Sequence, residues 1–329
     1  MRGSAAIRSI AGLPVADRIV RALAAVAPRR RDTLAVLTFH RIAPPDGVVP
    51  GLLSATPDGF GRLLDLAAEH FRVVGIEAVV ERAQGGAALP PRSLLLTFDD
   101  AYRDMAETVW PALAERGLPA VLFVPTAFPA DPGRVFWWER IWAAIQATQR
   151  RTVVVDGRTL PLTTAAERAS AYRAIRTVLK ASPHDRLEPS VAELERQLID
   201  DLGARPEPSG RSLDWGALIE MRQSGLGLGS HTRTHPLLTN VDDETLTREI
   251  RGGIEDLARE GGSDLPAFAY PSGAFDARAV DAVRAAGIRA AFTTERGVND
   301  LRNGDWLRLR RINVAVGTPS SLILAQAVR

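Results

Sequence analysis

The stretch LLLTFDD, residues 94–100, decides the fold that we expect for this chain. An uninterrupted apolar run of this length predicts a strand that is buried on both faces, as the strands of parallel sheets are. Asp99 and Asp100 end the run, so both carboxylates are expected at the carboxyl end of that strand, where α/β enzymes place their active sites. Because adjacent carboxylates repel each other, we expect one to bind a cation and the other to keep a tuned pKa. Taken alone, the pair could equally begin a helix as an N-cap.

Six further short apolar runs occur along the chain, and amphipathic helical patterns separate them. We predict strands at 34–39, 94–98, 120–124, 226–230, 267–270, 290–293 and 309–314. The helical patterns cover 60–70, 108–115, 215–223, 244–260 and 277–285. Strands that alternate with helices indicate an α/β fold with about seven parallel strands, either a barrel or a doubly wound sheet.

Residues from about 128 to 214 break this alternation, and we predict that they form an insertion over the mouth of the sheet. The region contains helical patterns at 165–180 and 191–202 and ends in a Pro-, Gly- and Ser-rich stretch at 206–210. Three tryptophans mark its start: Trp137, Trp138 and Trp142. They could stack on sugar rings, but the helical spacing of Trp138 and Trp142 favours packing within the insertion.

The composition restricts the partners and the site chemistry. A net charge of +2, from 41 basic and 39 acidic residues, provides no basic stripe, so a nucleic-acid partner is not expected. The absence of cysteine excludes thiolate ligands and cysteine nucleophiles, so any metal must be bound by histidine and carboxylate. No apolar run approaches the length of a membrane span.

Residues 1–31 carry an apolar helical face beside several arginines. We expect this amphipathic, basic helix to pack on the domain formed by residues 32–329, with peripheral membrane contact as the alternative. No signal peptide is evident, so the expected location is the cytoplasm, either free or membrane-associated. No pattern indicates an oligomeric state.

His231 and His235 lie four residues apart, directly after the predicted strand at 226–230. On one helical turn both imidazoles would face the same point, and His-x-x-x-His is a common metal-ligand spacing. The chain has only five histidines, which favours this interpretation over a pair of solvated or core histidines. With Asp100 they make a set of two imidazoles and one carboxylate, which leaves coordination positions open, as catalytic sites do.

The strand at 267–270 ends in a turn, Tyr270-Pro271-Ser272-Gly273. Pro271 and Gly273 favour a tight backbone that could direct the Ser272 N–H at a developing oxyanion. An ordinary strand-ending turn is the alternative. Asp276 is expected to cap the following helix.

These motifs occur in a fixed order: Thr97-Phe98-Asp99-Asp100, then His231-Thr232-x-x-His235, then Tyr270-Pro271-x-Gly273. Together they resemble the successive motifs of the polysaccharide deacetylase (NodB-homology, carbohydrate esterase) family, over residues from about 34 to 314. The resemblance implies a distorted (β/α) barrel that hydrolyses N-acetyl, or less often O-acetyl, groups on carbohydrate. It also implies that Asp99 is the catalytic base and that Asp100, His231 and His235 bind a divalent metal ion, with zinc expected first.

The chain departs from the family's pattern at three places. Ala101 replaces the usual glycine after the aspartate pair, which is a mild change. The arginine that often precedes the proline motif and orients the catalytic aspartate is missing, and Arg310 or Arg311 could substitute, with Arg311 preferred. The late Leu-x-His motif, which supplies the general acid, is absent because no histidine follows His235.

His40 is our candidate for the missing proton donor. It follows the predicted strand at 34–39 and so belongs on the same face as Asp99 and His231, with a purely structural histidine as the alternative. In the mechanism that we expect, the metal polarises water and the acetyl carbonyl, and Asp99 takes the water proton. The Ser272 N–H helps the metal to hold the oxyanion, and His40 protonates the leaving amine.

The sequence therefore predicts a metal-dependent hydrolase that removes an acetyl group, N-acetyl first, from a carbohydrate or glycan precursor. One alternative is a hydrolase of another C–N amide bond. Another is an inactive carbohydrate-binding relative, which the missing general-acid motif favours and the presence of Asp99 opposes.

Overall fold

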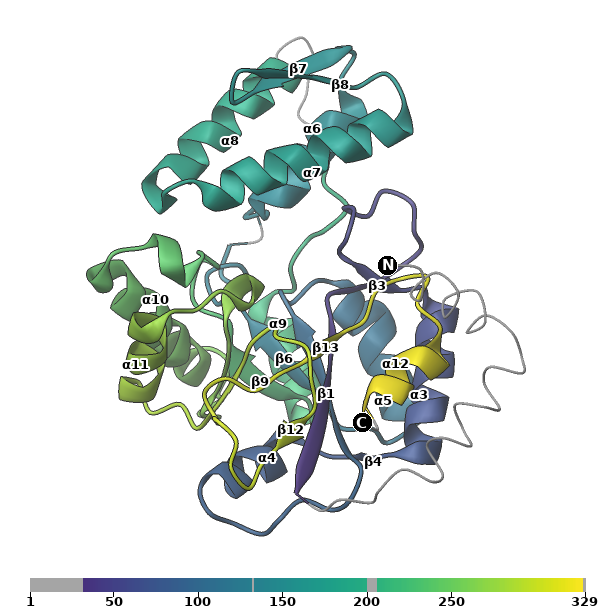
Figure 1. The fold of residues 1–329 in the computed structure, drawn as a ribbon, viewed down its shortest axis with the longest axis vertical. Coiled ribbons are helices and arrows are strands. Elements are labelled where there is room, and N and C mark those ends of the chain that lie inside the picture. The colour runs from purple at the N-terminus through teal and green to yellow at the C-terminus, as the bar shows by residue number, and fades with distance from the viewer. Residues whose placement is uncertain (1–31, 132, 200–205, 328–329) are drawn as a thin grey trace.

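The computed structural model describes residues 32–131, 133–199 and 206–327. The amphipathic helix expected at 1–31 lies outside the described residues. Figure 1 shows a larger α/β part and a smaller, mainly helical part that is stacked on it.

The larger part is built on a curved sheet in which seven strands run parallel. In order across the sheet they are β11 (Ala290–Phe292), β10 (Ala267–Ala269), β9 (Gly227–Ser230), β6 (Val121–Val124), β5 (Ser93–Asp99), β1 (Thr33–Phe39) and β13 (Ile312–Asn313). Each strand corresponds to one of the expected apolar runs, so the prediction of about seven parallel strands is confirmed. Two short strands extend the sheet: β4 (Arg72–Val73), parallel to β5, and β12 (Asn299–Asp300), antiparallel to β1.

The segment that leads into β13 joins the two edges of this sheet. Leu309 forms a parallel bridge with Phe292 of β11, and three residues later Ile312 pairs with Leu37 of β1. The Leu309 N–H donates to the Ala291 carbonyl at 2.8 Å. The sheet therefore curls into a distorted (β/α) barrel, as the family resemblance implied.

The barrel interior needs a glycine beside its large rings. An added Cβ at Gly229 of β9 would lie 2.6 Å from the ring of Phe123, which itself packs on Phe292 with ring centroids 5.3 Å apart. Only a residue without a side chain fits there, because interiors are packed too densely to move an aromatic ring aside.

Helices cover the outside of the barrel. They are α3 (Pro57–His70), α4 (Ile76–Ala83), α5 (Trp110–Glu115), α9 (Trp215–Gln223), α10 (Asp243–Arg259), α11 (Ala277–Ala285) and α12 (Ser320–Ala327). Asp276 caps α11 as expected, since its side chain accepts the Ala279 N–H at 2.9 Å. The single helix predicted at 108–115 is instead a π-helical turn, η1 (Met105–Val109), followed by α5. Pro111 has no N–H to donate at the junction, so the regular α-helical ladder is interrupted there. No helix among the described residues is long and apolar enough to cross a membrane.

Residues between β6 and α9 form the smaller part, which we call the insertion. It consists of α6 (Trp137–Ala147), the hairpin β7 (Thr152–Val155) and β8 (Arg158–Pro161), α7 (Ala165–Ala181) and α8 (His184–Ile199). These elements share a hydrophobic core of their own. Trp138 and Trp142 are buried in that core, so the packing interpretation holds for both, whereas Trp137 is only partly buried at its edge. The bounds of about 128–214 stay a prediction.

Candidate functional site

Three loops meet at the carboxyl end of the barrel, under the insertion. They follow β5, β9 and β10, which lie in the order β10–β9–β6–β5 across the sheet. Eight non-glycine residues of the described chain have a positive φ, and five of them belong to these loops: Asp100, Ala101, Thr232, His235 and Ser272. Such strained conformations persist where the surrounding structure fixes them, and they cluster at functional sites.

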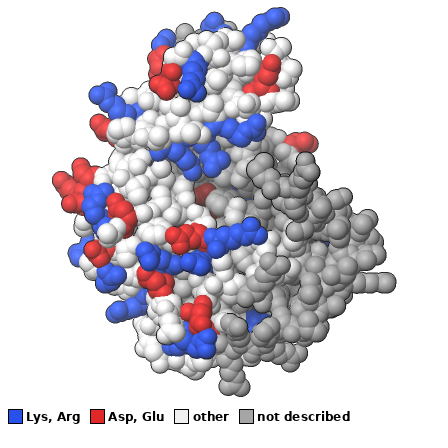
Figure 2. Space-filling view, in the orientation of Figure 1, with Lys and Arg blue, Asp and Glu red and all other residues white. Residues whose placement is uncertain are grey.

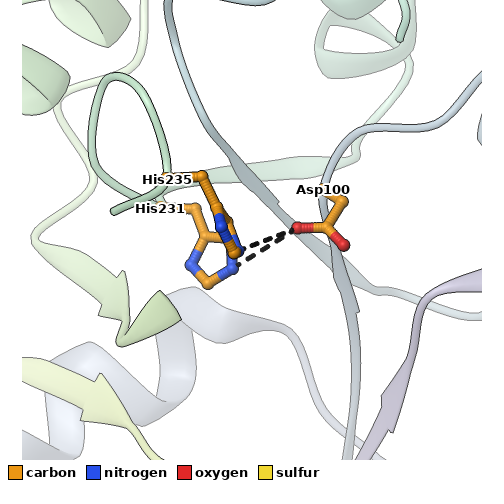
Figure 3. Close-up of side chains that lie close together, drawn as sticks. All are labelled: Asp100, His231 and His235. Atoms are coloured by element: carbon orange, nitrogen blue, oxygen red, sulfur yellow. Dashed lines mark ion pairs between the residues drawn. The ribbon is translucent and has the colours of Figure 1, made fainter. Parts of the chain in front are cut away.

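Asp100, His231 and His235 converge on one point, as Figure 3 shows. The Asp100 Oδ1 lies 3.7 Å from Nε2 of His231 and 3.3 Å from Nε2 of His235, and the three ligand atoms are all within 4.8 Å of one another. All three side chains are at least 93 % buried, yet Asp100 Oδ1 has no hydrogen-bond partner among the described residues. An orphaned buried carboxylate oxygen that faces two imidazole nitrogens fits a divalent cation bound between them.

The protonation states of these groups also suit a cation. Burial, reinforced by the neighbouring Asp99, raises the pKa of Asp100 well above its usual range, so an added positive charge would stabilise its ionised form. Burial lowers the pKa of His231 and lowers that of His235 further, which keeps both imidazoles neutral. Nδ1 of His231 lies 2.7 Å from the Ala269 carbonyl, which can only accept, so Nδ1 carries the proton and Nε2 offers its lone pair towards Asp100.

The backbone between the two histidines is a loop, and the expected helical turn is wrong. Thr232 and His235 have φ values of 68° and 62°, and the Thr232 hydroxyl accepts the His235 N–H at 3.0 Å. Left-handed residues cannot continue an α-helix, so this side-chain contact closes the turn instead. The imidazoles still face each other, with ring centroids 4.8 Å apart.

Two buried acids of α10 hold this loop, and neither was predicted from the sequence. Glu249 accepts the backbone N–H groups of Arg233 and Thr234 at 3.0 and 2.8 Å, and Asp256 accepts the Arg233 guanidinium at 2.8 Å. The two acids lie seven positions apart, on the buried face of the helix. The sequence signal that could have identified them is the presence of acidic residues at core positions of an amphipathic helix.

Asp99, the proposed base, forms a buried pair with Arg311. The guanidinium donates to both carboxylate oxygens at 2.9 and 2.8 Å, and its Nε donates to the Thr293 carbonyl at 2.8 Å. Burial alone would raise the pKa of Asp99, but the charge and hydrogen bonds of Arg311, together with His231 and His40, outweigh burial and hold that pKa well below its usual range. Of the two arginines considered from the sequence, Arg311 thus faces the aspartate, while Arg310 is exposed and lies 3.8 Å from Glu295.

His40 follows β1 at the same end of the barrel, with its backbone N–H donated to the Ser54 hydroxyl at 2.9 Å. Its imidazole interacts electrostatically with Asp99 and Arg311. Burial lowers the pKa of His40 to about 4, although Asp99 acts in the opposite direction. At neutral pH the side chain is therefore uncharged and holds a single ring proton.

Ser272 lies at the tip of η3 (Pro271–Gly273), with φ 54°. Gly273 is required beside it, because an added Cβ would lie 2.5 Å from the Thr294 backbone nitrogen. The Ser272 hydroxyl accepts a hydrogen bond from Lys180 Nζ at 2.7 Å. Lys180 belongs to α7 of the insertion, and sequence reasoning missed it as a site residue because 92 positions separate it from Ser272.

A second set of polar contacts ties the insertion to the barrel. Arg41 lies 3.2 Å from Asp104 and 3.5 Å from Glu139 of α6, and its guanidinium stacks over the Tyr102 ring. The Trp138 indole N–H donates to the Tyr102 hydroxyl at 2.8 Å. These groups are buried, so the insertion is fixed to the barrel close to the Asp99-Asp100 loop.

A distorted barrel with two imidazoles and two carboxylates at its carboxyl end defines a candidate metal centre. Residues 192–291 match the family model described as polysaccharide deacetylase. The matched region contains both histidines and the Tyr-Pro motif, while the aspartate pair lies before it. The resemblance to the polysaccharide deacetylase (NodB-homology) family that the motifs indicated is therefore confirmed. No curated protein sequence matches the chain.

Solved structures share the fold. The Streptococcus pyogenes deacetylase PplD, in complex with acetate, superposes with a TM-score of 0.59 at 19% identity, covering 92% of this chain and 100% of that one. IcaB from Ammonifex degensii gives 0.58 at 19% identity, covering 90% and 97%. The deacetylase domain of BpsB from Bordetella bronchiseptica gives 0.55 at 17% identity, covering 88% and 99%. At these identities the likeness concerns the fold, and the chemistry must be argued from the site.

Proposed function

We propose that this protein is a metal-dependent hydrolase that removes an acetyl group, N-acetyl first, from a carbohydrate or glycan precursor. One observation carries the proposal: Asp100 Oδ1 is buried without a hydrogen bond and faces two Nε2 atoms, beside a second carboxylate that a buried arginine holds. One carboxylate is then free to bind the metal, and the other to act as a base. The names of the solved structures that share the fold support acetyl removal.

Asp100, His231 and His235 would hold the ion, for which zinc suits the imidazole and carboxylate donors. When bound, the ion acidifies water and polarises the acetyl carbonyl. Asp99, ionised because Arg311 lowers its pKa, accepts the water proton. The Ser272 N–H, in the turn after β10, would donate to the oxyanion.

His40 is the proposed partner of the leaving group on the Asp99 side. Because its pKa is about 4, it would act at neutral pH by donating a hydrogen bond through its single ring proton. It does not hold the extra proton that an imidazolium would release. The protonation of the departing nitrogen therefore needs a further group.

The substrate is proposed to reach the site beneath the insertion. A pocket there is lined by His235, Ser272, Lys180 and Trp137, and Trp137 also lines an adjoining, wider hollow. The partly exposed indole offers a surface on which a sugar ring can stack. The cytoplasmic location, free or membrane-associated, remains our proposal and would suit a biosynthetic intermediate.

Metal analysis and acetate release test this function together. The purified protein should bind about one divalent ion per chain and release acetate from N-acetylglucosamine oligomers, and a chelator should abolish this activity until zinc is restored. Asp99→Asn should keep the ion and lose most turnover, whereas His231→Ala should lose both. Acetate release by Asp99→Asn at the wild-type rate would contradict the assignment of the base. Turnover of simple amides but of no acetylated sugar would favour the alternative C–N hydrolase.

A further inference from the structure

Lys180 is the single lysine among 41 lysine and arginine residues, and it reaches the candidate active site. It lies in the last turn of α7, and its Nζ donates to the Ser272 hydroxyl at 2.7 Å across the gap between insertion and barrel. An arginine occupies every other cationic position. A guanidinium stays protonated at any pH that the protein experiences, whereas an amine can release a proton.

The backbone that carries Lys180 is fixed to the barrel. Asn240, in η2 (Leu238–Asn240) after the histidine loop, donates its amide to the carbonyls of Lys180 and Ser182 at 2.9 and 3.3 Å. Leu179, next to Lys180, is buried in the core of the insertion. The end of α7 is therefore held from both sides, so the amine occupies a defined position.

Lys180 shares a pocket with groups of the candidate site. His235, Ser272, Trp138 and Asn240 line this pocket together with the lysine. Figure 2 shows basic side chains along the edge of the insertion that overhangs the hollow in the middle of this face. A substrate held between the His235 side and the insertion would therefore contact the amine.

The charges around Lys180 favour proton release. No carboxylate of the described residues forms an ion pair with it, and burial, followed by the charge of Arg176 one turn earlier on α7, lowers its pKa to about 8. Asp100 acts in the opposite direction. The charge of the lysine also lowers the pKa of His40 and of His235, in the loops after β1 and β9, and both imidazoles are neutral.

We propose that Lys180 is the proton donor to the leaving amine, supplied by the insertion in place of the missing Leu-x-His histidine. The inference rests on the proposed deacetylase function. As the C–N bond of the tetrahedral intermediate breaks, its electron pair stays on nitrogen and takes a proton from Nζ. The carbonyl re-forms to give acetate, the sugar leaves as a free amine, and the neutral lysine regains a proton from solvent, into which Asp99 releases the proton taken from water. Ser272 orients the ammonium through its hydroxyl.

Two substrates with different leaving groups test the donor role. Lys180→Arg keeps the charge but removes the transferable proton, so acetate release from N-acetylglucosamine oligomers should fall by about 10²–10⁴-fold, the range for losing a general acid. Hydrolysis of 4-nitrophenyl acetate should fall by less than about 3-fold, because nitrophenolate leaves without protonation. Arg173→Gln, an exposed position on the same helix, serves as the matched control and should leave both rates unchanged. Metal content and the melting temperature should match the wild type in both variants.

The outcomes separate the two proposals. A wild-type protein inactive on both substrates contradicts the proposed function. Retained amide turnover in Lys180→Arg, or an equal loss on both substrates, contradicts the role of Lys180 alone.

Amine labelling tests the lysine without any turnover. Because the chain has one lysine, acylation of the peptide that contains it reports a single amine. The N-terminal amine lies on another peptide, which mass spectrometry distinguishes by its mass. In the full-length protein, labelling of Lys180 should be half-maximal near pH 8, and Arg176→Gln should move that midpoint upward. A midpoint at the ordinary value of about 10.4 would overturn the proposal.

Discussion

At the scale of single residues, the pair of Asp99 and Arg311 decides the charge of the proposed base. Both side chains are almost completely buried, at 3 % and 1 % exposure, and two hydrogen bonds join them. The depressed pKa of Asp99 means that the pair contributes to stability above the unfolded pKa, and that this contribution is lost as pH falls through the folded pKa. The same pairing keeps the Asp99 carboxylate ionised over the whole pH range in which the protein works.

Replacing Arg311 should therefore change a pH profile as well as stability. In Arg311→Gln, the largest charge that opposes burial at Asp99 is lost and only His231 and His40 still lower its pKa, so that pKa rises and the acid limb of kcat/KM moves to higher pH. Breaking a buried pair from one side should also lower the free energy of unfolding by about 3–5 kcal/mol. Arg310→Gln is the matched control, since that neighbour is exposed, and it should leave both measurements unchanged. An unshifted acid limb in Arg311→Gln would contradict the role of Arg311 in lowering the pKa of the base.

His40 should affect rate without affecting the metal. His40→Ala removes the ring proton next to Asp99, and we expect lower turnover with wild-type metal content. Because the pKa of His40 is about 4, the wild-type profile should contain no ionisation of this group between pH 5 and 8. Measurement of kcat from pH 5 to 9 in both proteins checks this. Unchanged turnover in the variant would leave His40 a structural residue.

Residue types and strand ends were enough to predict most of this site. Asp99, Asp100, His231 and His235 were expected together because parallel strands end at the same face. The choice between Arg310 and Arg311 depended on which side chain faces inward, since neighbours in an extended segment point to opposite sides. Lys180 could not be predicted as a site residue, because nothing in the sequence indicates that the end of α7 lies next to the turn after β10.

At the scale of elements, α10 positions the histidine loop. Glu249 accepts three hydrogen bonds from Arg233 and Thr234, two from the backbone and one from the Thr234 hydroxyl. These bonds replace the helical ladder that the His-x-x-x-His spacing had led us to expect. The spacing correctly predicted that the two imidazoles lie together, but the helical turn expected between them is wrong. The left-handed φ values of this loop depend on contacts with a helix further along the chain.

Removing this support should weaken metal binding. Glu249→Ala leaves two backbone N–H groups of the loop without acceptors, so metal affinity should fall by about 10–100-fold, as when other groups that orient metal ligands are lost. Stability should fall by about 1–3 kcal/mol, the cost of unsatisfied buried donors. Glu255→Ala, exposed on the same helix, is the control. Competition with a chromogenic chelator measures affinity, and equal values for the two variants would contradict the role of Glu249.

Six of the seven parallel strands were predictable because each is a short run that is buried along nearly its whole length, whereas β13 has an exposed residue, Asn313. Elements with weaker patterns were missed, among them α4, α12, the short strands β4 and β12, and the hairpin of β7 and β8. In β7 buried and exposed residues alternate, which is typical of a hairpin that covers only one side of a core. Pro111 was visible in the sequence, but the π-helical turn that precedes it was not predicted.

At the scale of the whole molecule, the insertion covers the carboxyl end of the barrel and is held there by side-chain contacts. It is joined to the barrel by the Arg41 contacts on one side and by Asn240 on the other. Its core is a cluster distinct from the main barrel core, although Val49 and Tyr102 of the barrel part also belong to it. Placement of the Lys180 amine therefore depends on how the two parts dock, which makes the catalytic chemistry sensitive to contacts far from the reacting bond.

Asn240 offers a direct test of this dependence. Asn240→Asp keeps the size of the side chain but replaces the donating amide with a carboxylate, which cannot donate to the carbonyls of Lys180 and Ser182. The end of α7 should then fray, and both the greater hydration of Lys180 and the negative charge of the new carboxylate should raise its labelling midpoint from about 8 towards the ordinary lysine value. Amide turnover should fall with metal content unchanged, because the ligand loop is held by α10. Asn303→Asp, on an exposed turn, is the matched control. If the labelling midpoint stays near 8 in Asn240→Asp, the amine is placed by the insertion alone and the docking contact has no part in catalysis.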